Sequence, residues 1–374
     1  MRFLLVVIAL ALAASGWGCA PADQGASKHE LDAGNTASAG GDSDSETCSG
    51  SDSETDSDSE TGIVIDGGPD AGPEVIEQDC SDCPAVGSSL EQMACALDLC
   101  DEEVLLDSGY QALTGLNESC TLEDTYEAVE RFGSASNDLA PALGESYALM
   151  ATGPAEGTEH SVSCDDYSVD ATDPFSQDGE VDIHDAVQWS LLLRAPEEAQ
   201  AFRFKYVFFS EEYDDYIGSD YNDRFYAVIE AGSTNAGSPT VINFTDCREP
   251  DQYVDFVCGA GDPGCVEDEP YCYIAVNSAY SDCCWYNGCP EGYSWDVGTD
   301  ISGTGYECSQ SLEDGPEHGS STGWLQTAWP IEGSEVFSLT FHLHDTEDGI
   351  FDSEAVLDAF EFLATPDQGT VVVE

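Results

Sequence analysis

Basic side chains are almost absent from this chain of 374 residues, which has 8 Lys and Arg against 76 Asp and Glu and a formal net charge of −68. Such a charge repels nucleic-acid phosphates and anionic lipid surfaces, so we expect neither as a ligand. It attracts cations, and hard cations such as Ca²⁺ prefer several oxygen ligands. The alternative explanation is solubility in a salty medium, where counter-ions screen the self-repulsion.

Long apolar runs are missing after the N-terminal segment, so no later part of the chain is predicted to span a bilayer. At the start, Arg2 is followed by an apolar run over residues 3–14 and by Ser, Gly, the bulky Trp17 and Gly before Cys19, a pattern typical of a signal peptide of residues 1–18. The segment resembles a bacterial lipoprotein signal, with Gly16 where such signals usually have Leu. We therefore expect an exported outer-membrane or cell-surface lipoprotein that contacts the membrane only through a lipid on Cys19. Secretion without the lipid is the alternative.

Apolar side chains are also scarce in residues 19–79, where residues 41–62 repeat Asp and Glu with Ser, Thr and Gly. Such a segment cannot bury enough surface to offset the entropy of ordering, so we expect a disordered acidic linker. Its function would be to hold the following domain away from a membrane. The alternative is an unstructured leader.

Sixteen cysteines indicate an oxidising compartment, because disulfides persist there and are rare in the cytosol. Outside Cys19 and Cys48 fourteen remain, an even number that permits seven disulfides and leaves Cys48 as the odd one. The single Cys-x-x-Cys pair, at Cys80 and Cys83, favours disulfides over zinc or redox chemistry in an exported chain. Eight of the fourteen fall in residues 247–308, a loop insertion that cross-links would have to hold. The expected disulfide cysteines are Cys80, Cys83, Cys95, Cys100, Cys120, Cys164, Cys247, Cys258, Cys265, Cys272, Cys283, Cys284, Cys289 and Cys308.

A short helix is predicted after the first cysteines, because Leu90, Met93 and Leu97 follow helical spacing. Ser89 and Gln92 form a capping box at its start. Farther along, apolar residues recur at every second position between turns rich in Gly, Pro and Asp, which predicts an all-β antiparallel β-sandwich or jelly-roll-like domain. The residues expected to point inward are Val187, Trp189, Leu191, Leu193, Phe202, Phe204, Tyr206, Phe208, Phe225, Ala227, Ile229, Phe337, Leu339, Phe341 and Leu343.

These patterns divide the chain into four parts. They are the signal peptide at 1–18, the linker at 19–79, the β-sandwich domain at 80–366 and a tail at 367–374. Within the domain we expect a helical cysteine cap at 80–110 and the cysteine-rich insertion at 247–308.

Three segments of the domain share a distinctive arrangement of motifs. In residues 202–230 an aromatic strand is followed by SEEY, GS and NDRF, at residues 210–213, 218–219 and 222–225. Residues 136–153 look like an entry strand, and residues 337–362 look like a closing hairpin. Together these segments resemble the choice-of-anchor L domains of bacterial surface proteins. The resemblance implies an extracellular β-rich domain and no established enzymatic activity.

Three acidic turns are candidates for a shared cation. The stretch around Gly349 fails as an EF-hand loop, because Ala355 would stand where the last ligand belongs. A β-sandwich site would instead gather oxygens from separate turns, since crowded carboxylates repel unless a cation or protons neutralise them. The alternative is that these acids cap turns by accepting backbone N–H bonds. The candidates for a structural Ca²⁺ are Glu211, Glu212, Asp214, Asn222, Asp223, Asp345, Asp348 and Asp352.

Other chemistry has weaker support in the sequence. His342 and His344 share one strand face and could bind Zn²⁺ with Asp345, although a polar outer face of the sheet is favoured. The GSST stretch before Gly323 matches Gly-x-Ser-x-Gly at residues 319–323 but is not distinctive of a nucleophile elbow, which disfavours an esterase or protease of that type. A glycosidase needs two carboxylates at matched separation, and the sequence neither shows nor excludes such a pair.

Aromatic residues crowd one cysteine-rich loop and suggest a binding surface for sugar rings or protein side chains. A local core packed against the disulfides is the alternative. We therefore expect an adhesin-like binding or structural module that recognises a surface glycan, matrix component or protein. The competing hypothesis is a secreted polysaccharide hydrolase that uses a carboxylate pair. The loop residues are Trp285, Tyr286, Tyr293 and Trp295.

Overall fold

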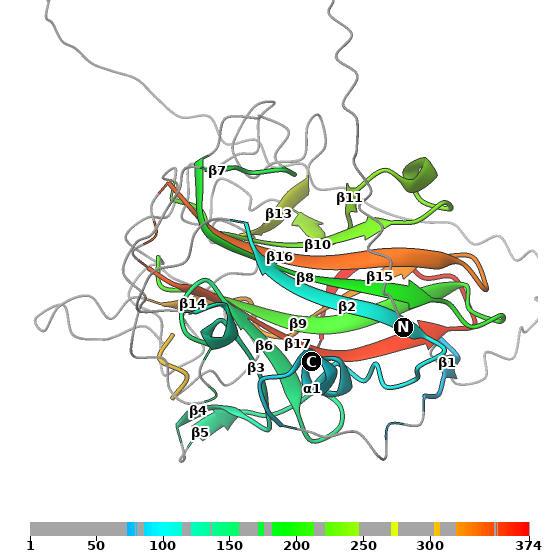
Figure 1. The fold of residues 1–374 in the computed structure, drawn as a ribbon, viewed down its shortest axis with the longest axis horizontal. Coiled ribbons are helices and arrows are strands. Elements are labelled where there is room, and N and C mark those ends of the chain that lie inside the picture. Colours follow the sequence, from blue (N-terminus) through cyan, green and yellow to red (C-terminus); the bar gives the residue numbers. More distant parts are fainter. Residues whose placement is uncertain are drawn as a thin grey trace, which may run out of the picture. The chain divides into compact units, whose positions relative to one another are not determined.

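The computed structural model describes the β-rich part of the chain and is drawn in Figure 1. The expected signal peptide, nearly all of the expected linker and most of the cysteine-rich insertion lie outside the described residues. The described residues are 73–78, 80, 86–113, 121–134, 137–155, 157, 171–175, 182–212, 221–246, 271–275, 303–306, 319–347, 349 and 351–373.

Two antiparallel sheets of eight strands each build the fold, which confirms the predicted all-β sandwich. Sheet A has the order β18 (Gly369–Val372), β15 (Leu325–Pro330), β9 (Ala201–Ser210), β17 (Ser353–Leu363), β6 (Tyr147–Ala151) and β3 (Tyr126–Val129), with β1 (Val75–Ile76) on β17 and β14 (Ser320–Ser321) on β9. Sheet B has the order β12 (Phe244–Asp246), β13 (Tyr271–Ala275), β10 (Arg224–Glu230), β16 (Val336–Thr346), β8 (Asp182–Arg194) and β2 (Leu105–Ala112), with β11 (Thr240–Val241) on β10 and β7 (Ala171–Thr172) on β8. The remaining elements are the hairpin of β4 (Phe132–Ser134) and β5 (Asn137–Leu139), the helix α1 (Leu90–Ala96), and the 3-10 turns η1 (Leu122–Asp124) and η2 (Asn235–Gly237).

The space between the sheets is filled by the predicted inward faces, all of which are buried in one continuous core. The aromatic rings contact each other across it. The ring of Phe202 on β9 stacks on those of Phe337 and Phe360, with centroids 5.3 and 5.5 Å apart, while the rings of Phe204 and Phe341 meet edge to face at 5.2 Å. Because burying such a side chain contributes about 1.5–3 kcal/mol, this contact face dominates the attraction between the sheets.

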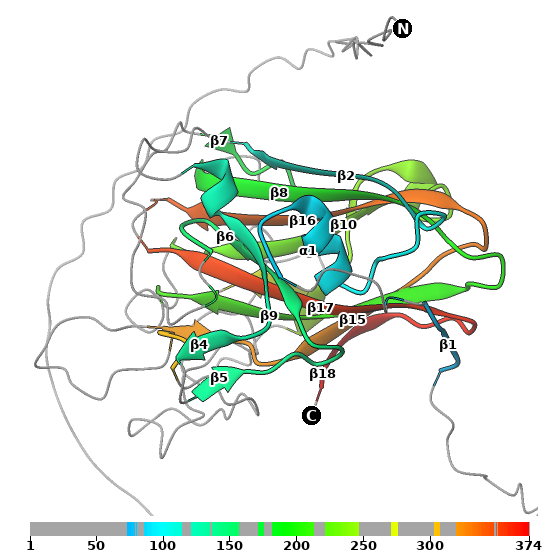
Figure 2. The same ribbon diagram turned by 60° about the horizontal axis from the view of Figure 1, so that its bottom comes forward.

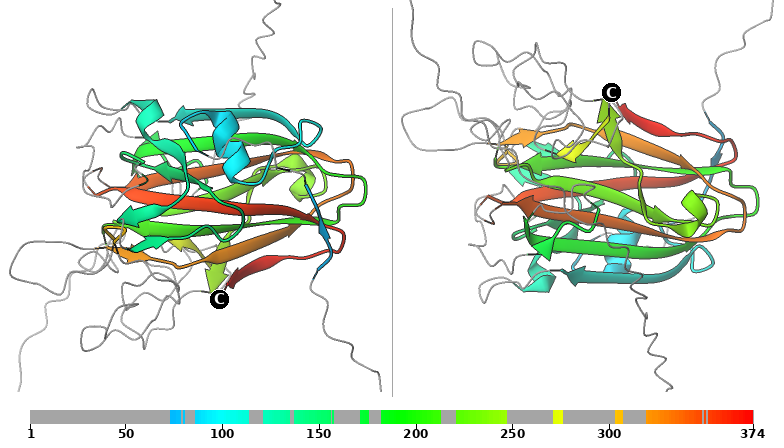
Figure 3. Two further views of the ribbon diagram at one scale, coloured as in Figure 1. Left: turned by 90° about the horizontal axis from the view of Figure 1, so that it is seen from below. Right: turned by 90° about the horizontal axis from the view of Figure 1, so that it is seen from above.

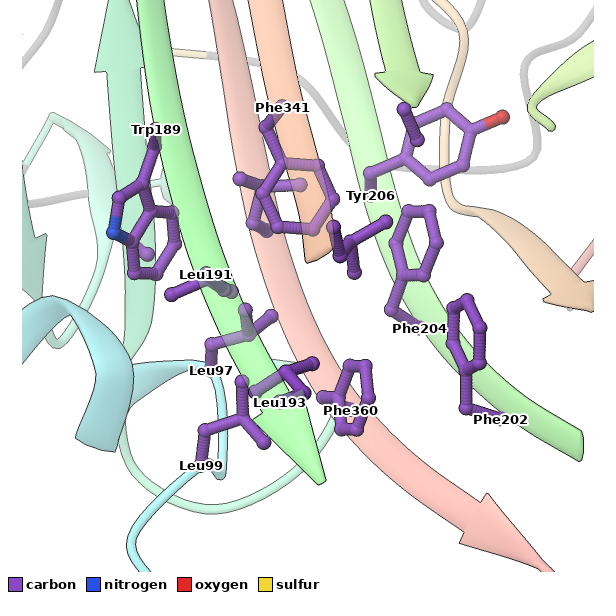
Figure 4. Packing of buried hydrophobic residues seen from close by; sticks show 14 of the residues in the cluster. Leu97, Leu99, Trp189, Leu191, Leu193, Phe202, Phe204, Tyr206, Phe341 and Phe360 are labelled. Carbon is purple, nitrogen blue, oxygen red and sulfur yellow. The ribbon is translucent and has the colours of Figure 1, made fainter. Parts of the chain in front are cut away.

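The predicted helix is present as α1, and it closes one open side of the sandwich. Its capping box forms as expected, with the Gln92 N–H donating to Ser89 Oγ at 3.2 Å and the Ser89 N–H to Gln92 Oε1 at 3.2 Å. The helix contacts β2, the edge strand of sheet B, and also β3 and β6 at the edge of sheet A. Leu97 and Leu99, which follow the helix, extend the core beside Leu193 (Figure 4).

A disulfide between Cys80 and Cys100, with Cα atoms 5.4 Å apart, fastens the ends of this cap. Cys95 in the helix is also disulfide-bonded. Three of the expected disulfide cysteines are therefore confirmed. Cys272 lies in β13, where its side chain is not described, and the other ten cysteines lie outside the described residues.

The expected closing hairpin is wrong. β16 pairs with β10 and β8 in sheet B, whereas β17 pairs with β9, β6 and β1 in sheet A. Between Thr346 and Ser353 the chain therefore passes from sheet B to sheet A, at the end of the sandwich where β16 ends and β17 begins (Figure 2). Alternation predicts which face of each strand is buried, but it does not predict which strand is the hydrogen-bonded neighbour.

The expected domain limits of 80–366 are too narrow, because strands on both sides belong to sheet A. Val75 and Ile76 of β1 pair with Leu363 and Phe362 of β17. At the other end β18 pairs with β15, which places the C-terminal strand at the edge of the sandwich (Figure 3). Both segments are short and partly exposed, so they lack the long alternating pattern that identifies the central strands.

Replacing Phe204 with Ala should lower the free energy of unfolding by about 3–5 kcal/mol, because it removes a fully buried ring and leaves a cavity between the sheets. Urea titration followed by tryptophan fluorescence measures the change. The matched control is Leu192→Ala on β8, whose side chain is 38% exposed, and we expect a change within about 0.5 kcal/mol. Equal losses in the two variants would contradict the assigned core.

Candidate functional site

Strand ends from both sheets meet at one end of the sandwich and bring the predicted acidic turns together. Asp223 is fully buried there, just before β10. Its carboxylate accepts hydrogen bonds from Ser353 Oγ at 2.7 Å and Ser210 Oγ at 3.3 Å, both from sheet A, and from the Thr346 N–H at 3.0 Å, from sheet B. Asp223 thus joins the two sheets through hydrogen bonds.

Asp345 lies beside Asp223 and is 1% exposed. Neither of its carboxylate oxygens has a hydrogen-bond partner among the described residues. The hydroxyl of Thr152, which slightly lowers the pKa of Asp345, is already engaged with the Ser353 backbone: it accepts from the N–H at 2.9 Å and donates to the carbonyl at 3.4 Å. A buried carboxylate without partners is costly, so this side chain requires an explanation.

Four carboxylates act on one another here, and we call Asp185, Asp223, Asp345 and Asp352 the carboxylate cluster. Burial raises the pKa of Asp345 well above its ordinary value, and the neighbouring charges of Asp223, Asp352 and Asp185 raise it further. Burial also raises the pKa of Asp223 to about 7, although hydrogen bonds from Ser353 and Thr346 lower it. Such pKa values mean that the folded protein favours protons or another positive charge at this place.

The backbone is shaped around these carboxylates. A bulge in β8, opposite Leu343 and Asp345 of β16, places Asp185 at a positive φ of 44°. A Cβ added at Gly153 would stand 1.8 Å from Asp352 Oδ2, and one at Gly349 would stand 2.6 Å from Asp185 Oδ2. A side chain at either position would therefore force the facing carboxylate to move.

The eight calcium candidates divide into three groups. Asp223, Asp345 and Asp352 join the cluster, while Asp214 and Asp348 lie outside the described residues. The others are near it: Glu211 Oε2 accepts the Asp352 N–H at 3.3 Å, the Glu212 N–H donates to Ser210 Oγ at 3.1 Å, and the Asn222 carbonyl accepts from Thr346 Oγ1 at 3.1 Å. Of these three, only Glu211 uses its carboxylate to accept a backbone N–H, as the turn-capping alternative expects, and Glu212 also forms a side-chain hydrogen bond with Asp223.

Asp185 is a member that the sequence does not predict. It lies inside β8, and only the bulge turns it toward Asp345. An acid within an otherwise apolar alternating strand is the signal that could have identified it. Within the described parts of the chain, no three His, Cys, Asp or Glu side chains form a ready-made metal-binding group.

The histidine pair lies on the outer face of sheet B, as favoured, but this face is buried. His342 Nε2 and His344 Nδ1 are 2.8 Å apart, and Gln188 Nε2 lies 3.0 Å from His342 Nδ1. Burial lowers the pKa of His342 to about 4 and that of His344 further below its ordinary value, so both rings are neutral at pH 7. The acid beside the pair is Asp173, 3.8 Å from His344 Nε2, and not Asp345.

One of the few arginines compensates the charge of Asp173. The guanidinium of Arg224 is fully buried and lies 3.3 Å from Asp173 Oδ2, which also accepts from the Tyr226 hydroxyl at 2.8 Å. Burial by itself raises the pKa of Asp173, but the facing His344 and Arg224 outweigh this and hold it below its ordinary value. Arg224 therefore compensates the negative charge of Asp173, whereas no described cation compensates that of Asp345.

A pocket of about 260 Å³ beside the Cys80–Cys100 disulfide is lined by two further acidic residues. Its lining includes Asp98, Glu361 and Phe360. Glu361 is paired with Arg203 at 2.7 Å, while burial and the charge of Glu361 raise the pKa of Asp98 to about 6. The pocket is slightly smaller than typical ligand sites.

No protein-family model matches the chain, and no match was found among curated proteins or solved structures. In the part of the chain that the structure describes, no helix has the length and apolar character needed to cross a bilayer. Cys19 and the aromatic loop residues Trp285, Tyr286, Tyr293 and Trp295 lie outside the described residues.

Replacing Asp98 with Asn should stabilise the protein above pH 6 and have little effect below pH 4. The folded pKa of about 6 exceeds the ordinary 3.8, so the stability contributed by the protonated form is present below pH 4 and lost as the pH rises to 6. Asn also suits the positive φ of 66° at this position. We expect a gain of about 1 kcal/mol at pH 8 after allowing for solvent screening.

Urea unfolding at pH 4 and pH 8 measures this difference, with Glu102→Gln on the exposed neighbouring loop as the control for loss of one negative charge. A gain of the same size at both pH values would mean that Asp98 is not protonated by folding.

Proposed function

We propose that the protein is an adhesin-like binding or structural module displayed outside the cell. In this proposal a lipid on Cys19 anchors it, residues 19–79 act as the spacer, and the β-sandwich is the displayed part. The observation that carries the proposal is the Cys80–Cys100 disulfide, which ties the helical cap across the open side of the sandwich. Such a cross-link is typical of proteins that work in an oxidising compartment.

The partner we propose is a surface glycan, a matrix component or another protein. The resemblance to choice-of-anchor L domains supports a role in surface display. The loop with Trp285, Tyr286, Tyr293 and Trp295 is the proposed contact surface, since aromatic side chains stack on sugar rings and anchor protein contacts. The burial of the carboxylate cluster, whose members are at most 3% exposed, supports a structural role for these acids.

The alternative is a secreted carbohydrate hydrolase, and one observation favours it. In the pocket beside the cap disulfide, Asp98 has a raised pKa and faces Glu361, which resembles the division of roles between a proton donor and a charged carboxylate. An assay of released reducing ends on a polysaccharide panel tests this. Turnover that is lost in both Asp98→Asn and Glu361→Gln would replace the binding proposal with the hydrolase.

The anchor is tested by Cys19→Ser in the full chain expressed in a lipoprotein-processing bacterial host. We expect the unchanged chain in the membrane fraction, extractable only by detergent, and the variant in the soluble exported fraction. The control is Cys48→Ser, which alters the other linker cysteine and should leave the partition unchanged. Equal partition of the unchanged chain and Cys19→Ser would exclude lipid on this residue.

The partner class is tested with the full chain on arrays of glycans and matrix proteins. We expect a hit that weakens at least tenfold when Trp285 and Trp295 are both replaced by Ala, because each buried aromatic contact at an interface contributes 1–2 kcal/mol or more, roughly tenfold in affinity. Val336→Ala, at a side chain 47% exposed on β16, is the control for general surface changes. Binding that is indifferent to the tryptophans would rule out the loop as the contact surface.

A further inference from the structure

The carboxylate cluster has a property that the function proposed above does not use: it lies where the two sheets are joined. Asp345 and Asp185 come from strands of sheet B, while Asp352 directly precedes β17 of sheet A. Asp223 is hydrogen-bonded to both sheets, through Ser353 and Thr346. Any ligand held by these four carboxylates would therefore cross-link the sheets at this end.

Asp345 is the side chain that provides the evidence for a bound ligand. It is 1% exposed, it has no hydrogen-bond partner among the described residues, and it lies within the field of three further carboxylates. Leaving a buried carboxyl group unsatisfied costs about 1–3 kcal/mol, and more when it is charged. Turn capping does not explain Asp345, because it accepts no backbone N–H.

The hydrogen bonds of Asp223 likewise do not compensate its negative charge. Its hydrogen-bond partners are the hydroxyls of Ser210 and Ser353, the Thr346 N–H and the side chain of Glu212, none of which carries a positive charge. The nearby Arg224 does not compensate it, because its guanidinium is turned to Asp173 and Tyr226 on the outer face of sheet B. Two buried acids thus remain for which the described structure provides no positive charge.

We propose that the carboxylate cluster binds a calcium ion, with Asp345 and Asp223 as the central ligands and Asp185 and Asp352 completing the site. This site goes beyond the display function, since it would stabilise the sandwich whatever partner the protein binds. The described side chains are not preassembled as a metal-binding group, so the ion would draw them inward.

The donor chemistry selects calcium among the common divalent cations. The cluster offers only oxygen atoms, whereas Zn²⁺ prefers nitrogen and sulfur, and His342 and His344 lie beside each other near Asp173 on the outer face of sheet B. Ca²⁺ accepts six to eight oxygens in a flexible geometry that includes backbone carbonyls and water. Mg²⁺ requires a nearly ideal octahedron, which donors from four separate segments are poorly suited to build.

Calcium binding is tested on the purified full chain after treatment with EDTA and buffer exchange. We expect the Tm to rise by roughly 5 °C or more when free Ca²⁺ exceeds its Kd a hundredfold, and to rise less with Mg²⁺ at the same concentration. In Asp345→Asn the Kd for Ca²⁺ should increase at least tenfold, so that at the same Ca²⁺ concentration the rise in Tm falls to about half or less. Asp358→Asn, which changes another fully buried carboxyl group on β17, should keep the rise.

A second measurement uses Tb³⁺ as a luminescent probe of the site. Tyr306 lies near the cluster, because its pKa is raised by burial first and then by the charges of Glu354, Glu211, Asp352 and Asp345. Excitation of tyrosine should therefore sensitise Tb³⁺ emission, and Tyr306→Phe should reduce that emission without abolishing the Tm rise with Ca²⁺. The acidic linker contains no Tyr or Trp, so ions bound there would not give this signal.

The alternative is that protons alone neutralise the cluster, and it predicts the opposite outcome. Asp345→Asn would then raise the Tm equally with Ca²⁺ and with EDTA, because it removes a buried acid and no ligand. A Tm of the unchanged chain that is the same in Ca²⁺ and EDTA would overturn the calcium site. The same conclusion would follow if Asp358→Asn weakened the calcium response as much as Asp345→Asn.

Discussion

The packing of aromatic inner faces between the two sheets is the interaction on which the rest of the structure depends. Phe202 and Phe204 of β9 meet Phe337 and Phe341 of β16 across the core, and Phe360 of β17 completes the contact. Once these faces are pressed together, the strand ends beyond them must also approach each other. The acidic turns are therefore buried, because hydrophobic burial, worth several kcal/mol per aromatic pair, outweighs the cost of crowding carboxylates.

The two buried polar regions differ in how their negative charge is compensated. On the outer face of sheet B, Asp173 faces Arg224 and the hydroxyl of Tyr226, so its charge is compensated by the protein itself. At the end of the sandwich, Asp223 and Asp345 have no such cation among the described residues. In a chain with so few basic residues, compensation from outside by a metal ion or protons is the physical alternative to an ion pair.

Much of the fold could be predicted from local pattern. The capping box at Ser89 and the inward faces of β8, β9, β10 and β16 were predictable, because helix caps and alternation depend on neighbours in sequence. The closing hairpin was predicted wrongly, since adjacent strands in sequence were assumed to pair. The candidate site was predicted in part: Asp223, Asp345 and Asp352 converge, whereas Asp185 required the bulge in β8.

By itself, the sequence determined which residues are inside, because period-two patterning and the aromatic content dictate the buried faces of the strands. It also determined the excess of acid over base, and hence that any buried acidic group has few possible partners. Only the tertiary structure decided that the chain crosses from sheet B to sheet A between β16 and β17. That crossing, a consequence of long-range strand pairing, places Asp352 beside Asp345 and converts separate acidic turns into one buried cluster.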